Sequence, residues 1–377
     1  MKLKHLLLSL VLSWAGAVSA NSVTVGVVLP LTGPASGLGI PTANAIAMWP
    51  KTLAGKEVKV VVMDDATDPT MGAKAAQRLI SEQRVDVLLG STATPVAISM
   101  ATLATQSGTP QLATSPVALP AGEDKWLFRL AQSNAIMAAR IVDHMKKTGI
   151  KTVGFLGYTD AFGEQWLKEF QDEGAKHGIR VVGTERFARA DTSVTAQALK
   201  LVSRKPDAIL IVASGSGAGM PQKAIMERGF KGSVYQTHAA ATRDLMRTAG
   251  KDAEGGYVVS GPATVGEMLP ETHPSKQLAT RFVKQYEDKH GANSRTNFAA
   301  NGFDAWLILE KAVPIALKKA EPGTPEFRAA LRDAFETMGT VTLAGGVLNW
   351  TSDDHWGYSN ETGVILKVAD GKFQVAK

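Results

Sequence analysis

Residues 23–37 have the sequence VTVGVVLPLTGPASG. Its first half, 23–29, is almost entirely apolar, which is typical of a strand in a parallel sheet that is covered on both faces. The strand runs into 30–37, a loop rich in glycine, proline and small hydroxyl residues. Ligands of open parallel sheets bind beyond the carboxyl ends of the strands. The stretch therefore predicts an α/β fold and a candidate ligand-binding loop after the first strand.

The same alternation of short apolar runs and helix-period segments continues along the chain. Buried strands are predicted at 23–29, 58–63, 85–89, 152–156, 179–182 and 208–213. Helices are predicted at 71–82, 94–106, 135–147, 164–177, 195–203 and 222–228. The βαβα pattern occurs over roughly 22–130 and again over 150–260, which indicates two doubly wound parallel-sheet lobes. Residues 273–336 are nearly all helical in pattern, so they are expected to complete these two lobes.

Composition excludes several classes of protein. At roughly 150 residues per domain, the 377 residues suggest two domains, and 45% apolar residues are enough for two cores. The chain has no cysteine, which excludes disulfides, thiolate metal or iron–sulfur sites, a catalytic cysteine and a lipidated cysteine. The net charge of +6 is modest, so a nucleic-acid partner is not expected.

The first 20 residues have the pattern of a secretory signal peptide. Lys2 and Lys4 precede a short apolar run, and small residues occupy 18–20, where cleavage would occur. The run is too short for a membrane anchor, which needs about 20 apolar residues. We therefore expect a cleaved export signal, a mature chain beginning at Asn21 and a periplasmic location.

Several motifs together resemble one family. They are VGVVLPLTGPASG at 25–37, VDVLLG at 85–90, DAFGE at 160–164 and DAEG at 252–255. The whole mature chain resembles the periplasmic leucine/isoleucine/valine-type substrate-binding proteins of branched-chain amino acid ABC transporters. This resemblance implies the type I periplasmic binding protein fold, in which two lobes joined by three crossovers close around a ligand.

The resemblance also implies the division of the chain. The crossovers are expected near 128–131, 258–263 and 340–344. Lobe I would comprise 22–130 and 263–342, and lobe II would comprise 131–262 and 343–377. The implied partners are a small-molecule ligand and a membrane ABC permease with its ATPases, and we expect a monomer that needs no cofactor or metal.

Two loops of lobe I match the carboxylate-binding loops of these relatives. Thr94, four residues after Gly90, matches the first carboxylate hydroxyl, and Ser115 lies in the second loop with Thr114 and Ala113. Neutral donors of this kind can hold a carboxylate through charge-assisted hydrogen bonds. Simple helix capping by the hydroxyl groups is the alternative interpretation.

The chain departs from the amino-acid-binding pattern where relatives place acidic partners for the ligand's ammonium group. The lobe II acid is replaced by His238, and the loop after Arg129 offers only amides and a hydroxyl. A buried ammonium without an acidic partner would cost several kcal/mol. His238 or Tyr235 could instead hydrogen-bond a carbonyl or hydroxyl of the ligand.

The expected pocket also differs in size and shape. The loop with Ser214 and Gly215 lacks the aromatic that relatives often carry, which opens volume. Phe162 matches a family aromatic that could stack on a planar ligand, and Leu38 would line the lobe I wall. These features favour an aromatic or 2-keto carboxylate of the benzoate, phenylpyruvate or cinnamate type. Binding of a branched-chain or other amino acid is the alternative.

Two other classes of protein compete with a transport function. An enzyme is not favoured, because the segment 215–219 lacks the spacing of a nucleophile elbow or phosphate loop and the seven histidines show no paired metal spacing. A ligand-sensing receptor module stays open, because the same fold serves as a sensor domain.

Overall fold

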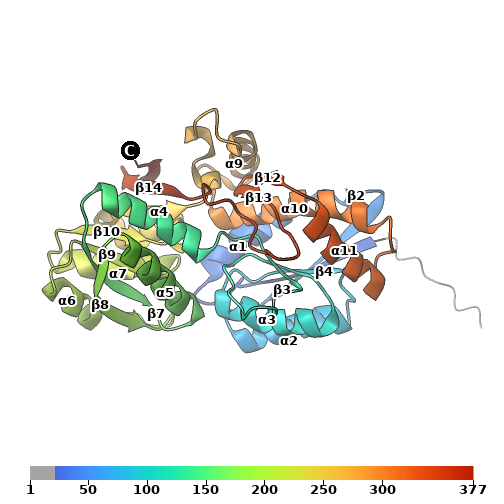
Figure 1. Cartoon of the computed structure of the whole chain (residues 1–377), viewed down its shortest axis with the longest axis horizontal. Helices are drawn as coiled ribbons and strands as arrows, with labels where there is room; N and C mark the ends of the chain where they lie inside the picture. The colour runs from blue at the N-terminus through green and yellow to red at the C-terminus, as the bar shows by residue number, and fades with distance from the viewer. Residues whose placement is uncertain (1–21, 377) are drawn as a thin grey trace, which may run out of the picture.

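The computed structural model describes residues 22–376, so the expected signal peptide lies outside the described residues. The chain forms two α/β lobes that lie side by side, each built on its own sheet (Figure 1). The two lobes and their mainly parallel sheets confirm the predicted fold class. No helix within 22–376 is both long and apolar enough to cross a membrane.

Lobe I contains a six-stranded sheet with the order β2-β3-β1-β4-β5-β6. All neighbours are parallel except β2, which pairs with β3 in antiparallel fashion. The strands are β1 (Ser22–Leu29), β2 (Thr52–Leu53), β3 (Lys56–Asp64), β4 (Val87–Gly90), β5 (Gln111–Ala113) and β6 (Leu127–Arg129).

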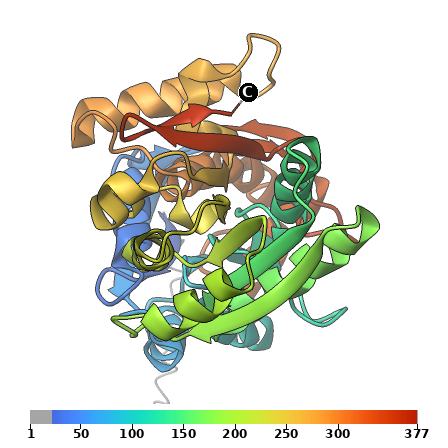
Figure 2. The same ribbon diagram turned by 90° about the vertical axis from the view of Figure 1, so that its left-hand side faces the viewer.

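Lobe II contains a seven-stranded sheet with the order β15-β14-β11-β10-β9-β7-β8. Its first five strands along the chain are parallel, and the C-terminal hairpin β14–β15 adds an antiparallel edge (Figure 2). These strands are β7 (Thr152–Tyr158), β8 (Arg180–Phe187), β9 (Ala208–Val212), β10 (Ser233–Gln236), β11 (Tyr257–Ser260), β14 (Val364–Ala369) and β15 (Lys372–Val375). β8 was predicted as a buried strand but is half-exposed, because it lies at the other edge of the sheet.

Helices cover both faces of the lobe I sheet, as the apolar strands require. Val28 packs against α2 (Pro69–Ser81) and α3 (Thr94–Ser107), whereas Val27 and Leu29 pack against α10 (Asn297–Ala316) and α11 (Pro325–Thr337). A distant helical segment therefore returns to cover the sheet formed by the first part of the chain. The other helices that this lobe contributes are α1 (Ser36–Ile46) and α9 (Lys276–His290).

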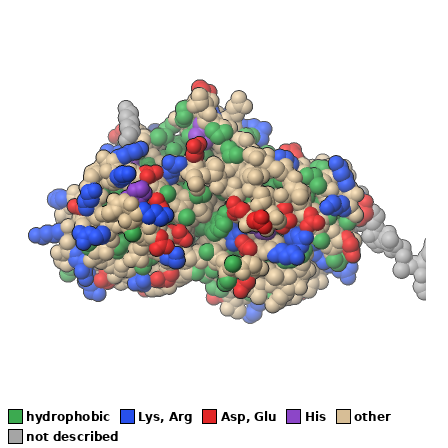
Figure 3. Space-filling model, in the orientation of Figure 1, with side chains coloured by type: hydrophobic (Ala, Val, Ile, Leu, Met, Phe, Trp, Pro, Cys, Tyr) green, Lys and Arg blue, Asp and Glu red, His purple; other side chains and the backbone are tan. Residues whose placement is uncertain are grey.

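The helices of lobe II pack with its sheet in one large apolar core. They are α4 (Asn134–Lys147), α5 (Ala161–Lys176), α6 (Thr195–Ser203), α7 (Ser216–Glu227), α8 (Arg243–Ala249) and the short 3-10 turns η1 (His238–Ala240) and η2 (Gly250–Ala253). The 3-10 segment η3 (Pro262–Met268) follows β11 and packs against α9 of lobe I. Charged side chains of both signs are interspersed over the surface of the two lobes (Figure 3).

Three connections join the lobes, and the third differs from the expected division. The chain passes between the sheets after β6, after β11, and between the small hairpin β12 (Val341–Leu343)–β13 (Gly346–Leu348) and β14. Leu348, Trp350 and Tyr358 still belong to the lobe I core. Trp350 packs edge-on against Phe128 and Phe335, with ring centroids 5.2 and 5.9 Å away. The chain joins the lobe II sheet only at Val364, well after the expected boundary at 343, because these aromatic contacts hold the intervening segment on lobe I.

Candidate functional site

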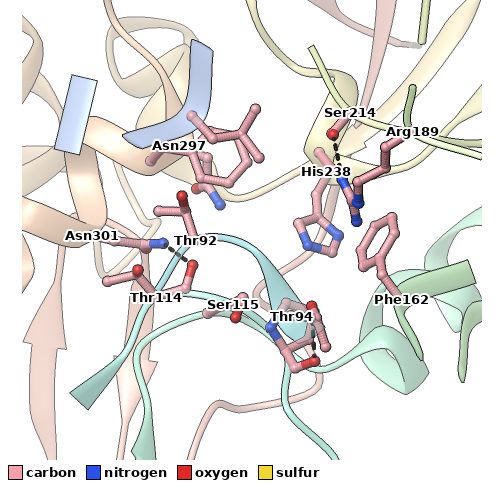
Figure 4. A pocket seen from close by; sticks show the side chains of 15 residues that line it. Thr92, Thr94, Thr114, Ser115, Phe162, Arg189, Ser214, His238, Asn297 and Asn301 are labelled. Atoms are coloured by element: carbon pink, nitrogen blue, oxygen red, sulfur yellow. Dashed lines mark hydrogen bonds between the residues drawn. The ribbon is translucent and has the colours of Figure 1, made fainter. Parts of the chain in front are cut away.

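A cavity lies between the lobes, where the carboxyl ends of strands from both sheets face each other (Figure 4). In this closed arrangement of the lobes its free volume is small, about 20 Å³. Fifteen residues line it: Leu38, Thr92, Thr94, Thr114, Ser115, Pro116, Ala131, Phe162, Arg189, Ser214, His238, Ala239, Asn297, Phe298 and Asn301. The position agrees with the general placement of ligands at the carboxyl ends of parallel strands.

The lobe I wall is rich in hydroxyl groups. Thr94 begins α3, Thr92 precedes it, and Thr114 and Ser115 follow β5 directly. The hydroxyl oxygens of Thr92, Thr114 and Ser115 are buried and have no hydrogen-bond partner in the protein. Thr94 donates its hydroxyl to the carbonyl oxygen of Pro116 at 3.4 Å. Unpaired buried polar atoms are costly, so this set of groups fits a polar ligand group.

Two further features make the lobe I wall suitable for an anion. No side chain caps the N-terminus of α3, so the first-turn N–H groups and the positive end of the helix dipole remain available. The buried carboxyl group of Asp65, directly after β3, is not in the cavity lining and accepts hydrogen bonds from the Ser91 hydroxyl at 2.6 Å and the Thr67 backbone N–H at 2.8 Å. Burial raises the pKa of Asp65 to about 6.

Asn297 and Asn301 also line lobe I, and sequence reasoning missed both of them. They lie one turn apart at the start of α10, and both are almost fully buried. Asn297 donates to Gln132 at 3.2 Å and Asn301 donates to the Thr114 carbonyl at 3.4 Å, while both side-chain oxygens lack partners. The available signal was two amides at i and i+4, on the same face at the start of a largely apolar helix.

The lobe II wall contains His238, which is 2% exposed. Its Nδ1 atom has no hydrogen-bond partner, and its ring lies near Phe162 and Trp166, with centroids 6.1 and 5.9 Å away. Burial lowers the pKa of His238 to about 4. The imidazole is therefore neutral near pH 7 and can donate from one nitrogen and accept at the other.

Arg189 is a further lining residue that sequence reasoning missed. It lies two residues after β8, and its Nε atom donates to Asp160 Oδ2 at 2.5 Å. Its Nη1 atom donates to the Ser214 hydroxyl at 3.1 Å. No local motif marks this arginine, because only the fold brings it to the cavity.

Apolar groups from both lobes meet across the cavity. Leu38 and Phe298 from lobe I pack in the same buried cluster as Phe162 from lobe II. The lobes are therefore closed, and a bound ligand would be enclosed between them, with these apolar side chains beside it. Seven of the residues predicted from the sequence line the cavity: Leu38, Thr94, Thr114, Ser115, Phe162, Ser214 and His238.

Three predicted positions do not line the cavity. Tyr235 is directed away from it, because its hydroxyl pairs with His144 Nδ1 at 2.8 Å and its ring stacks on Tyr257 at 5.0 Å. Ala113 is the last residue of β5 and is buried in a separate apolar cluster.

Gly215 has a backbone role instead. Its φ of +52° favours glycine, and its N–H donates to the Ala239 carbonyl. The residues that follow it, expected to continue a loop, form the first turn of α7.

Within the described residues, no group of three or more His, Cys, Asp or Glu side chains could hold a metal ion. The catalytic pairings of nucleophile and base that acyl transfer needs are also not found among the lining residues.

Comparisons with known proteins agree with this architecture. A family model described as "Periplasmic binding protein" matches residues 22–371. The chain belongs to the periplasmic binding protein family. An extracellular ligand-binding receptor from Rhodopseudomonas palustris HaA2 is 41% identical and has a TM-score of 0.92, with 94% of this chain and 100% of that chain covered.

Two more distant relatives carry informative names. The solute binding protein of an ABC transporter from Rhodopseudomonas palustris BisB5, solved in complex with 3,4-dihydroxy benzoic acid, is 25% identical, with a TM-score of 0.78 and coverage of 94% of this chain and 95% of that chain. Leu/Ile/Val-binding protein homolog 3 of Brucella melitensis is 23% identical over 96% of this chain and 95% of its own length.

The family identification confirms the resemblance found in the sequence. This periplasmic binding protein is a solute-binding component of an ABC-type system and not an enzyme, and the family implies a periplasmic location.

Proposed function

We propose that this protein binds an aromatic or 2-keto carboxylate, of the benzoate, phenylpyruvate or cinnamate type, for an ABC importer. The observation that carries the proposal is the charge of the cavity. Among its described lining residues there is no aspartate or glutamate, whereas Arg189 is cationic and His238 is neutral. A ligand with a carboxylate and no amine suits such a cavity.

An α-amino acid fits the same cavity poorly. Its ammonium group would be buried beside Arg189 without an acidic lining residue to neutralise it. Removing a charged group from water costs several kcal/mol unless a partner compensates for it. The neutral imidazole of His238, at the position of the acid in amino-acid-binding relatives, can accept a hydrogen bond but supplies no negative charge.

The two walls suggest how the ligand lies. The carboxylate fits the lobe I end, where the hydroxyls of Thr92, Thr114 and Ser115 are unpaired and α3 begins. A planar ligand body would pack on Phe162 and Phe298, which both line the cavity, because aromatic rings attract one another edge-to-face or offset. The relative from Rhodopseudomonas palustris BisB5 with its bound dihydroxybenzoic acid supports this ligand class.

Amino-acid binding is the second candidate, and the name of the Brucella relative favours it. Calorimetric titration of the purified protein with phenylpyruvate, 4-hydroxybenzoate and leucine separates the two candidates. We expect binding of one or both acids and no heat with leucine. Tight leucine binding with no response to the acids would refute the proposal.

A variant tests the placement of the carboxylate. Ser115→Ala removes a hydroxyl that has no partner in the protein, so folding should be little affected and acid binding should weaken about 10-fold or more. Ser193→Ala, which removes an exposed hydroxyl far from the cavity lining, is the control and should leave binding unchanged. Equal affinities of the two variants would place the carboxylate elsewhere.

The remaining partners follow from the family. We propose that the loaded, closed protein acts as a monomer and docks on a membrane permease with its ATPases, without a nucleic acid or cofactor. Export through the leader predicts a mature N-terminus at Asn21, which N-terminal sequencing of a periplasmic extract would test. Uptake of the bound acid should be lost when the gene is disrupted, whereas an intact uptake with lost chemotaxis would favour a sensor.

A further inference from the structure

The lobe II wall holds an arginine whose position is fixed on three sides. Arg189 Nε donates to Asp160 at 2.5 Å, Nη1 donates to the Ser214 hydroxyl at 3.1 Å, and the guanidinium lies 4.2 Å from the ring centroid of Tyr158. Its end lies between His238 and Phe162 at the cavity (Figure 4). The side chain is therefore pre-organised and faces the site that a ligand would occupy.

Much of the hydrogen-bonding capacity of this arginine is unused. A guanidinium carries five N–H donors. Only two bonds are formed, to Asp160 and to Ser214, so three donors are left without a partner among the described residues. The side chain is 15% exposed in the closed protein, so a ligand oxygen at these donors would take the place of water. The donors fit an oxygen atom of the ligand.

The charges around Arg189 decide whether this ligand oxygen belongs to the carboxylate or to a neutral group. Asp160 accepts both from Arg189 and from the backbone N–H groups of Phe162 and Gly163, so it stays beside the guanidinium as the N-cap of α5. A ligand carboxylate at Arg189 would place two anions on one cation. The opposite wall offers an uncapped helix N-terminus and unpaired hydroxyls with no lining anion. The ligand carboxylate therefore prefers lobe I, and Arg189 is left to donate to a neutral oxygen.

We propose that Arg189 and Ser214 form a second polar subsite, which selects aromatic acids that carry a neutral oxygen acceptor, such as a phenolic hydroxyl, at the end opposite the carboxylate. This inference rests on the proposed function and makes the ligand class narrower. Arg189 is a specificity-determining residue in this scheme, because it discriminates between ligands that share the same carboxylate.

Matched ligand pairs test the subsite. Dissociation constants would be measured by calorimetry for benzoate with 4-hydroxybenzoate and for cinnamate with 4-hydroxycinnamate. In the wild-type protein we expect at least one hydroxylated acid to bind about 10- to 100-fold more tightly than its parent, which is the range of one charge-assisted hydrogen bond. Arg189→Gln should abolish that preference, because it weakens binding of the hydroxylated acid more than binding of its parent.

Arg186→Gln is the matched control. Arg186 also links β8 to α5, through an ion pair with Glu164, but it lies on the surface and does not line the cavity. This variant should keep the wild-type preference. Arg189→Lys keeps the positive charge beside Asp160 and should fold, while losing the fork geometry and most of the preference.

The outcomes distinguish the subsite from the proposed function. Equal wild-type affinities within both pairs would overturn the subsite alone. If Arg189→Gln weakened binding of the hydroxylated acid and its parent equally, the subsite would also be overturned, because that result would place the ligand carboxylate on Arg189. Failure of the wild-type protein to bind any of the four acids or phenylpyruvate would overturn the proposed function, and the subsite with it.

Discussion

Burial of His238 predicts a specific loss of stability in acid. In the closed protein burial lowers the pKa of this imidazole to about 4, from an ordinary value of 6.5. The folded protein therefore binds a proton at this site less readily than the unfolded chain does. The free energy of unfolding that His238 contributes is fully present above pH 6.5, and it is lost as the pH falls from 6.5 towards 4.

The size of the effect follows from the gap between the two pKa values. Each pH unit of the gap corresponds to about 1.4 kcal/mol. From pH 6.5 to pH 5, protonation of the unfolded chain at this position should therefore lower the free energy of unfolding by about 2 kcal/mol. His238→Gln keeps a neutral polar side chain of similar size, and its free energy of unfolding should not show this loss in acid.

Urea denaturation between pH 4 and 8 would measure it. The difference in unfolding free energy between the wild type and His238→Gln should change by about 2 kcal/mol from pH 7.5 to pH 5, in favour of the variant. Parallel profiles for the wild type and His238→Gln would refute the reasoning.

Three further predictions concern stability. Trp350→Ala should lower the free energy of unfolding by about 3–5 kcal/mol in urea, because the ring is fully buried, whereas Leu199→Ala, at a side chain 59% exposed, should change it by less than about 0.5 kcal/mol. Burial raises the pKa of Asp304 to about 7, so its contribution is present at low pH and is lost as the pH rises towards 7; Asp304→Asn should remove this part of the pH profile, and an unchanged profile would contradict the assignment. Gly217→Ala would place a methyl group 2.2 Å from the Tyr158 hydroxyl oxygen and should cost about 1–3 kcal/mol. Tyr158→Phe removes the clashing oxygen, so Gly217→Ala should cost less free energy of unfolding in the Tyr158→Phe background than in the wild type. An equal cost in both backgrounds, measured by urea unfolding, would argue against the clash.

Much of the fold was predictable because it rests on local patterns. The apolar runs at β1, β3, β4, β7 and β9 fall within one to two residues of the observed strands, since a strand covered on both faces must be apolar at nearly every position. Short strands such as β5 and β6 were missed. They have only three residues each, so their conformation depends on pairing with neighbours and not on their own sequence.

The third connection between the lobes was also placed wrongly by sequence reasoning. Nothing local shows that the segment after β13 stays on lobe I. Its position depends on Trp350, whose ring fits between Phe128 and Phe335, and these three residues are distant in the chain. Contacts between residues so far apart in the chain form only when the tertiary structure packs them into one core.

The candidate site was predictable to the extent that it follows strand ends. Thr94, Thr114 and Ser115 come directly after strands of the lobe I sheet, and the structure brings all three to the cavity. Tyr235 also lies near a strand end, but its side chain faces α4, because successive residues of a strand point to opposite faces. Strand position alone therefore identified the loops better than it identified the individual side chains.

The sequence by itself determined the α/β class, the family, the absence of cysteine chemistry and the lack of an acid at position 238. These properties depend on residue types and on short-range periodicity, which a linear sequence displays directly. The tertiary structure alone decided that Arg189, Asn297 and Asn301 line the cavity. These side chains come from a loop and a helix more than 100 residues apart, and only the packing of the two lobes brings them to one ligand.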